Sequence, residues 1–171
     1  MDARGRYLLP GLADMHVHIQ RVEDLPLFVA AGITTVRNMH GGPQHVEWRD
    51  RIANGTLDGP TIVTSGPPLG QGFWRDPRFV GLWTTADAEN VVRQQAQAGY
   101  DMIKVIQKIS VPVYRRLLEA ARAAHMPVVG HVPPGIGLEL TLAAGQASLE
   151  HVDGLAPESR LAFLFGQDAA G

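Results

Sequence analysis

The stretch Ala98-Gly99-Tyr100-Asp101-Met102-Ile103-Lys104-Val105-Ile106 is the clearest copy of a unit that recurs along the chain. A helical segment ends in Ala-Gly, a few mixed residues follow, and a short β-branched or apolar run comes next. The same order occurs over residues 31–36 and 144–152. Glycine just past a helix adopts the left-handed conformation that ends it, and the apolar run predicts a buried strand.

Six strands are expected from this pattern and from two further runs that lack the Ala-Gly pair. They are Leu12–Ile19, Ile33–Asn38, Thr61–Ser65, Met102–Ile106, Val128–Val132 and Ser148–Val152. Two helices lie between them. One spans residues 88–98 and follows a capping-box spacing at Thr84 and Asp87; the other opens at Ser110. Strands that alternate with helices indicate an α/β fold with a parallel sheet, either a barrel or a doubly wound sheet.

Ionisable side chains follow or interrupt four of these strands. His16 and His18 are two residues apart at the end of the first strand, so both imidazoles face one side. A His-x-His pair is weak evidence alone, but Lys104, His131 and His151 sit near the ends of the fourth, fifth and sixth strands. Catalytic groups collect at that edge of parallel α/β sheets, so the five residues together predict a binuclear metal site.

Lys104 has two interpretations. An unpaired ammonium inside an apolar strand is costly, so an ion pair to a neighbouring strand would explain it simply. The alternative is a lysine with a depressed pKa whose neutral amine captures carbon dioxide as a carbamate, an anion able to bridge two metals.

Four segments resemble motifs of the metal-dependent amidohydrolase superfamily, in its imidazolonepropionase-like and Xaa-Pro dipeptidase-like branch. They are Leu9-Pro10-Gly11-Leu12-Ala13-Asp14-Met15-His16-Val17-His18, Tyr100-Asp101-Met102-Ile103-Lys104-Val105, Val129-Gly130-His131 and Ser148-Leu149-Glu150-His151-Val152. The resemblance implies an incomplete (β/α)8 TIM barrel covering about the first six βα units. It also implies hydrolysis of amide-type C–N bonds in small amide or dipeptide substrates.

The resemblance further implies a role for each site residue. His16 and His18 would bind the more buried metal, carboxylated Lys104 would bridge both ions, and His131 and His151 would hold the second. The cofactor would be two divalent ions, in most relatives zinc. A hydroxide between them would be the nucleophile, because metal coordination lowers the pKa of water to about 7.

The match also has gaps. Relatives place an Asp at the end of an eighth strand, and a complete barrel needs roughly 250 residues, whereas this chain has 171. Asp153 and Asp168 lie beyond the sixth strand, and strand alternation would turn Glu150 away from His151. Residues 1–7 would be the remnant of an N-terminal β-sandwich segment and 8–171 the partial barrel. Two functional interpretations therefore remain open: a hydrolase with impaired activity, and a non-catalytic metal-binding fragment.

Composition limits the partners. The net charge is −2 and no membrane-length apolar run occurs, so neither nucleic acid nor a membrane is expected. There is no cysteine, which excludes disulfides and thiolate metal sites. Without a signal sequence, a cytoplasmic location is the default expectation. The outer strands of an open sheet would be unpaired, so we expect either an oligomer or a partner that supplies the missing segment.

Several other residues receive structural interpretations. Asn38, where relatives often carry Asp after the second strand, is expected either to support the metal ligands from behind or to be structural, and Phe73 and Trp74 are expected to pack on the barrel rim. Three further histidines fall in predicted loops or helices, where we expect them to be solvated: His40, His45 and His125.

Overall fold

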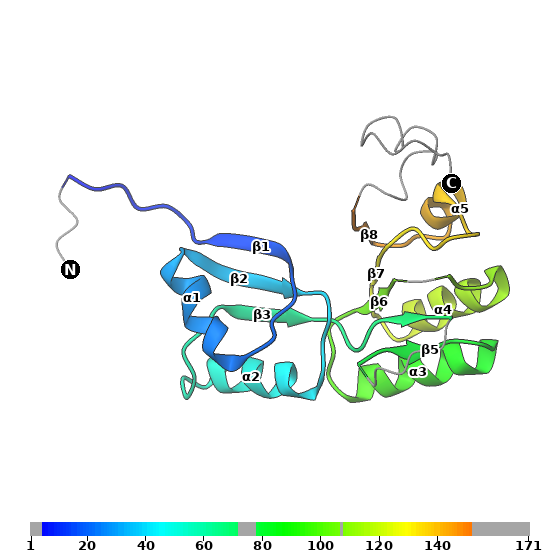
Figure 1. The fold of residues 1–171 in the computed structure, drawn as a ribbon, viewed down its shortest axis with the longest axis horizontal. Helices are drawn as coiled ribbons and strands as arrows, with labels where there is room; N and C mark the ends of the chain where they lie inside the picture. Colours follow the sequence, from blue (N-terminus) through cyan, green and yellow to red (C-terminus); the bar gives the residue numbers. More distant parts are fainter. Residues whose placement is uncertain (1–4, 72–77, 107, 152–171) are drawn as a thin grey trace, which may run out of the picture.

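The computed structural model describes residues 5–71, 78–106 and 108–151. Each of the six predicted strands is found at its expected place, in most cases one to three residues shorter than predicted. These are β1 (Leu12–Val17), β2 (Ile33–Asn38), β3 (Thr61–Thr64), β6 (Ile103–Val105), β7 (Val128–Gly130) and β8 (Ser148–Leu149). Two short strands, β4 (Leu69–Gly70) and β5 (Val80–Gly81), lie between β3 and α3 and were not expected (Figure 1).

Every strand pairing is parallel. One sheet has the order β1-β2-β3 and the other has the order β5-β4-β6-β7-β8. An isolated parallel bridge between Ser65 and Met102 joins the end of β3 to the start of β6. The carboxyl ends of β1, β2, β3, β6, β7 and β8 therefore meet on one side, as expected of an α/β fold.

Helices connect successive strands. They are α1 (Leu25–Ala30), α2 (Pro43–Ala53), α3 (Thr85–Gln97), α4 (Val111–Ala123) and α5 (Leu138–Ala143), with a 3-10 turn at Val22–Asp24. The predicted capping box of α3 is confirmed: Thr84 Oγ1 accepts from the Asp87 amide at 3.1 Å, and Asp87 Oδ2 accepts from the Thr84 amide at 2.8 Å. None of the described helices is long and apolar enough to cross a membrane. In the sequence, the apolar run Leu161–Phe165 predicts the start of a further helix; this run and the rim residues Phe73 and Trp74 lie outside the described residues.

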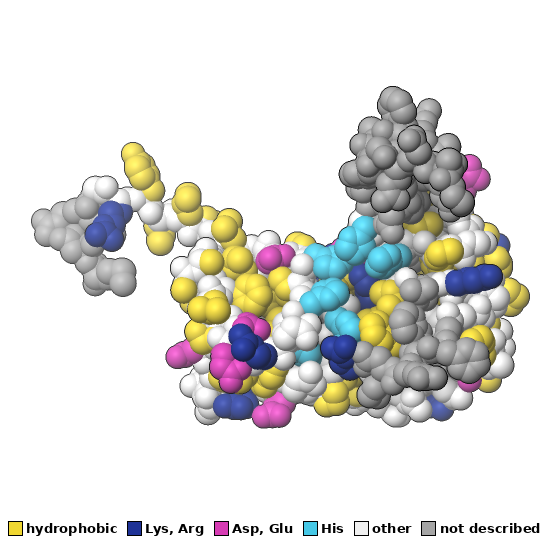
Figure 2. Space-filling view, viewed as in Figure 1, with side chains coloured by type: hydrophobic (Ala, Val, Ile, Leu, Met, Phe, Trp, Pro, Cys, Tyr) yellow, Lys and Arg dark blue, Asp and Glu magenta, His cyan; other side chains and the backbone are white. Residues whose placement is uncertain are grey.

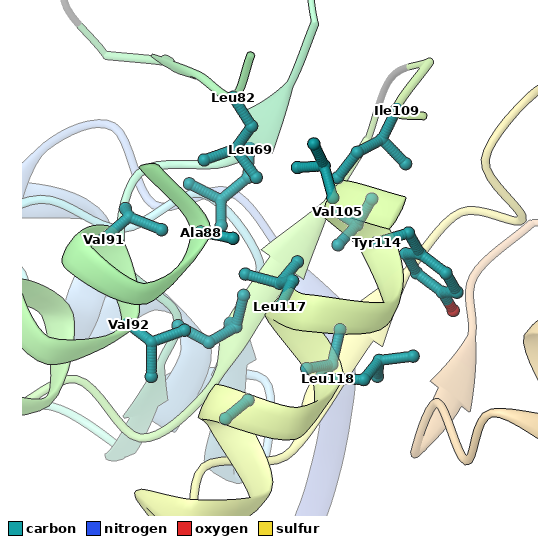
Figure 3. Close-up of a cluster of buried hydrophobic side chains, with 14 of the residues drawn as sticks. Leu69, Leu82, Ala88, Val91, Val92, Val105, Ile109, Tyr114, Leu117 and Leu118 are labelled. Carbon is teal, nitrogen blue, oxygen red and sulfur yellow. The ribbon is translucent and has the colours of Figure 1, made fainter. Parts of the chain in front are cut away.

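The main hydrophobic core lies between α3, α4 and the sheet that contains β6 and β7 (Figure 3). Leu117 and Tyr114 of α4 are fully buried there. The Tyr114 hydroxyl points away from the cluster and donates to Gln146 Oε1 at 2.8 Å. A smaller core lies around Leu25 and Val36, between α1 and the β1-β2-β3 sheet.

Gly130 at the end of β7 is required by close packing. Its φ is +128°, and a Cβ there would lie 2.0 Å from the backbone oxygen of Val105. Only glycine avoids that collision. The contact sets β7 tightly against β6 immediately before His131 and beside Lys104.

Candidate metal centre

The structure brings all five predicted ligands to one edge of the strands. His16 is the second-last residue of β1, and His18 directly follows that strand. Lys104 is the central residue of β6. His131 and His151 come just after β7 and β8. Figure 2 shows the histidine side chains gathered on one face, between the two halves of the molecule.

The imidazole rings form a continuous chain. The ring centroids of His16 and His18 are 5.4 Å apart, those of His16 and His151 are 4.8 Å apart, and those of His151 and His131 are 4.7 Å apart. His40, expected to be solvated, is instead half-buried and extends the chain, with its centroid 5.7 Å from that of His18. This expectation was wrong because the His40 ring packs against the rings of His18 and Phe79.

Lys104 is buried inside this edge. Its side chain is 1% exposed, and its Nζ has no hydrogen-bond partner among the described residues. Burial lowers the pKa of Lys104 to about 8; Glu150 opposes the shift and Arg37 adds to it. The ion-pair interpretation of Lys104 therefore lacks a contacting partner among the described residues, and burial makes the neutral amine more populated near neutral pH than in an exposed lysine.

Glu150 corrects one prediction from the sequence. Its Oε2 lies 2.8 Å from His16 Nδ1, so it faces the site rather than pointing away from it. Oε1 accepts from Arg37 at 2.5 Å and from Ser148 Oγ at 2.6 Å. The expectation failed because β8 ends at Leu149 and His151 has φ +70°, which breaks strand alternation. Glu150 and His151 thus both contact His16.

The environment keeps Glu150 ionised. Burial pushes its pKa upward, but hydrogen bonds from Ser148 and His16, with the positive charges of Arg37 and Lys104, bring the pKa below the usual glutamate value. Burial, together with the neighbouring His16, His40, Lys104 and His151, lowers the pKa of His18, in that order of importance. These effects favour a negative Glu150 and a neutral His18.

Two buried residues support the segment that follows β1. Asn38 accepts the Ile19 amide at 3.1 Å and donates to Thr64 Oγ1 at 3.1 Å, which confirms its expected structural role. His45, expected to be solvated, is instead 2% exposed. Its Nδ1 accepts the Gly42 amide, and its Nε2 lies 2.9 Å from the Ile19 carbonyl oxygen. The His45 side chain therefore caps the N-terminus of α2. His125 is exposed, as expected.

A cavity of about 380 Å³ adjoins the histidine chain. It is lined by Ile19, Gln20, His40, Gly41, Gly42, Pro43, Gln44, His45, Pro67 and Arg78. Because His40 reaches both this cavity and His18, a molecule in the cavity would lie beside the predicted ligands. A cavity of this size admits a small organic molecule.

No protein-family model and no curated protein sequence matches the chain. Solved structures do. Bottromycin amidohydrolase is 28% identical, with a TM-score of 0.79 over 94% of this chain and 35% of its own. A prolidase candidate from Bifidobacterium longum is 25% identical, with a TM-score of 0.70 over 83% of this chain and 40% of its own. The chain is related to the amidohydrolase superfamily.

The relationship is on the Xaa-Pro dipeptidase-like side of the amidohydrolases and covers part of their length. A Xaa-Pro dipeptidase with bound methionine shares the fold at 20% identity and a TM-score of 0.73, over 92% of this chain and 51% of its own. The chain thus spans about a third to a half of the amidohydrolase structures that it matches.

The similarity to amidohydrolases implies a metal ion at the predicted ligands. In the described part of the chain, no three His, Cys, Asp or Glu side chains surround a common point as they stand. Two imidazoles on one tetrahedral zinc have ring centroids roughly 5 Å apart, close to the observed 4.7–5.4 Å between successive rings. The ring spacing and the buried amine of Lys104 would suit metal ligation only after the side chains rearrange around an ion.

Proposed function

We propose that this chain supplies the metal-holding part of a hydrolase that cleaves amide-type C–N bonds. One observation carries the proposal: Lys104, 1% exposed and without a hydrogen-bond partner in the described chain, lies beside a run of four histidines at one strand edge. A structural lysine would be paired, whereas a ligand precursor needs an unoccupied amine. The relationship to amidohydrolases supports the same interpretation.

In this proposal His16 and His18 hold one divalent ion, and His131 and His151 hold a second. Lys104, carboxylated on Nζ, bridges them. Two zinc ions suit a site of imidazoles without thiolates. When bound, such ions supply Lewis acidity and lower the pKa of water. His40 and the cavity beside it position the substrate against this edge.

A small amide or dipeptide is the proposed substrate. The cavity volume of about 380 Å³ suits a molecule of that size. Two of the similar structures carry prolidase or Xaa-Pro dipeptidase in their names, and one of them holds a methionine. By analogy, the same class of substrate is proposed here.

Residues outside these 171 are proposed to complete the catalyst. In the described chain β1 pairs only with β2, and β8 only with β7, so each has an open edge where further barrel strands would fit. We propose that the described strands form about six units of an eight-unit barrel. The proton-transferring carboxylate would come from an added strand, because both oxygens of Glu150 are already engaged.

The alternative is a metal-binding fragment without activity, and a direct assay separates the two. The 171-residue chain with zinc is expected to hydrolyse a panel of dipeptides and cyclic amides poorly, because general acid–base help is typically worth 10²–10⁴-fold. A chain extended to the length of its relatives should gain at least that factor. If the extended chain gains nothing while it binds metal, the fragment interpretation is correct.

The role of Lys104 is tested by substitution and rescue. Lys104→Ala should lose most bound zinc, and short carboxylic acids should restore part of it by replacing the carbamate. Lys104→Arg should not bind zinc, since a guanidinium stays protonated and cannot capture carbon dioxide. Lys108→Arg, at an exposed position, is the matched control and should keep full zinc content. Full zinc content in Lys104→Arg would refute the bridging role.

A further inference from the structure

Glu150 makes polar contacts with three elements of the fold, and the sequence alone did not predict these contacts. The side chain is 8% exposed and links three elements: His16 of β1, Arg37 of β2 and Ser148 of β8. A carboxylate this deep is costly unless its oxygens are satisfied. Here Oε1 accepts from Arg37 and Ser148, and Oε2 is left for the imidazole of His16.

The contact with Glu150 decides which nitrogen of His16 carries the proton. An ionised carboxylate can only accept hydrogen bonds, so the 2.8 Å contact requires a proton on Nδ1 of His16. In a neutral ring Nε2 then keeps its lone pair. Nε2 is therefore the nitrogen that can bind an ion.

The backbone on both sides of His16 is held as well. The His16 amide donates to Asp14 Oδ1 at 3.1 Å, and the Met15 carbonyl accepts from Arg37 Nε at 2.7 Å. These contacts occur where the β1–β2 register is irregular, between Asp14 and Val17. Arg37 therefore fixes both the strand that carries His16 and the carboxylate that orients its ring.

We propose that Glu150 is a positioning residue that fixes the Nδ1–H tautomer and the orientation of His16 so that Nε2 serves as the ligand. Carboxylates that accept the second ring N–H of a ligating histidine typically change metal affinity 10–100-fold when removed. The ligand part of this inference rests on the proposed function. The tautomer part does not, because it concerns a hydrogen bond that exists without metal.

The test is ¹⁵N NMR of the histidine side chains in the full chain, free of metal, at a pH where the rings are neutral. The His16 signals are assigned by their loss in His16→Gln. In the unaltered chain His16 should show a protonated Nδ1 and a bare Nε2. A His16 protonated on Nε2 would overturn the inference, whatever the variants do.

Substitutions extend the test. Glu150→Ala should shift His16 toward the Nε2–H tautomer and weaken zinc binding by about 10–100-fold. Glu150→Gln has a single oxygen, which Arg37 and Ser148 engage, so its amide nitrogen would face Nδ1 of His16 and donate to it; this variant should also shift His16 toward the Nε2–H tautomer. If Glu150→Ala fails to fold, as judged by circular dichroism, the unaltered and Gln spectra still decide the tautomer.

The control is Glu47→Ala, an exposed acid of α2 that pairs with Arg51, which should change neither the His16 tautomer nor zinc binding. If zinc binding survives Glu150→Ala unchanged, the positioning role is wrong. If neither the unaltered chain nor any variant binds zinc but His16 is protonated on Nδ1, the proposed function fails while the tautomer assignment stands.

Discussion

The two halves of the molecule are held together in different ways. The C-terminal half (described residues from 66 to 151) contains a large apolar core in which α3 and α4 cover β4, β6 and β7. The N-terminal half (residues 5–65) has a much smaller cluster around Leu25 and Val36. Several large apolar side chains there are exposed, Leu12 and Met15 of β1 among them. Hydrophobic burial therefore stabilises mainly the half that carries Lys104 and His131.

The candidate centre draws ligands from both halves, so polar contacts must join them. Arg37 in the N-terminal half reaches Glu150 and Ser148 in the C-terminal half. Where the end of β3 meets the start of β6, Asp101 accepts from Arg49 and from the Thr64 amide. The comparison shows that the apolar core builds the scaffold, whereas hydrogen bonds between the halves set the geometry of the site.

The largest effect is expected in the C-terminal core. Leu117→Ala removes a fully buried side chain and should cost about 2–5 kcal/mol of unfolding free energy. Leu25→Ala in the smaller cluster should cost less, because its half-buried neighbours can close over the cavity. Urea unfolding measures both, with exposed Leu27→Ala as the control. A larger cost at Leu25 would contradict this account of the two halves.

A smaller effect is expected where the core meets the site. Gln146 is buried; it accepts from Tyr114 and donates to the carbonyl oxygens of Gly130, His131 and Ser148. Gln146→Leu leaves these groups unsatisfied and should cost about 1–3 kcal/mol. It should also lower zinc affinity through His131. Thermal melts and zinc titration check this, and exposed Gln94→Leu should leave both unchanged.

The junction between β3 and β6 should contribute less. Arg49 and Asp101 are both partly exposed, so solvent screens their ion pair. Arg49→Ala should cost less than about 1 kcal/mol and leave metal binding intact. Loss of zinc in this variant would show that both junctions, rather than the one through Glu150, position the ligands.

The smallest effect is a pH dependence of stability. Burial lowers the pKa of His45, so the folded state takes up this proton only at a lower pH than the unfolded state does. Its stabilising contribution is present above the unfolded pKa of about 6.5 and is lost as the pH falls below it. His45→Gln should flatten the fall of Tm between neutral and mildly acidic pH. The same substitution at exposed His125 should leave that slope unchanged.

Much of the fold could be predicted because the strands carry local signals. The Ala-Gly pairs mark helix ends, and the β-branched runs that follow mark β2 and β6. Strand alternation correctly placed His16 and His18 on one face. It failed at Glu150, because the left-handed residue His151 is set by tertiary contacts and not by local pattern. His45 was also missed, since its partner Ile19 is distant in sequence.

His16, His18, Lys104, His131 and His151 are proposed to hold divalent metal together. The most direct test is the zinc content of the 171-residue chain, purified from zinc-supplemented medium and measured by elemental analysis per mole of folded protein. About two zinc ions per chain are predicted, and a single ion would show that only one half of the site is formed. Folded protein that contains no metal would contradict the account.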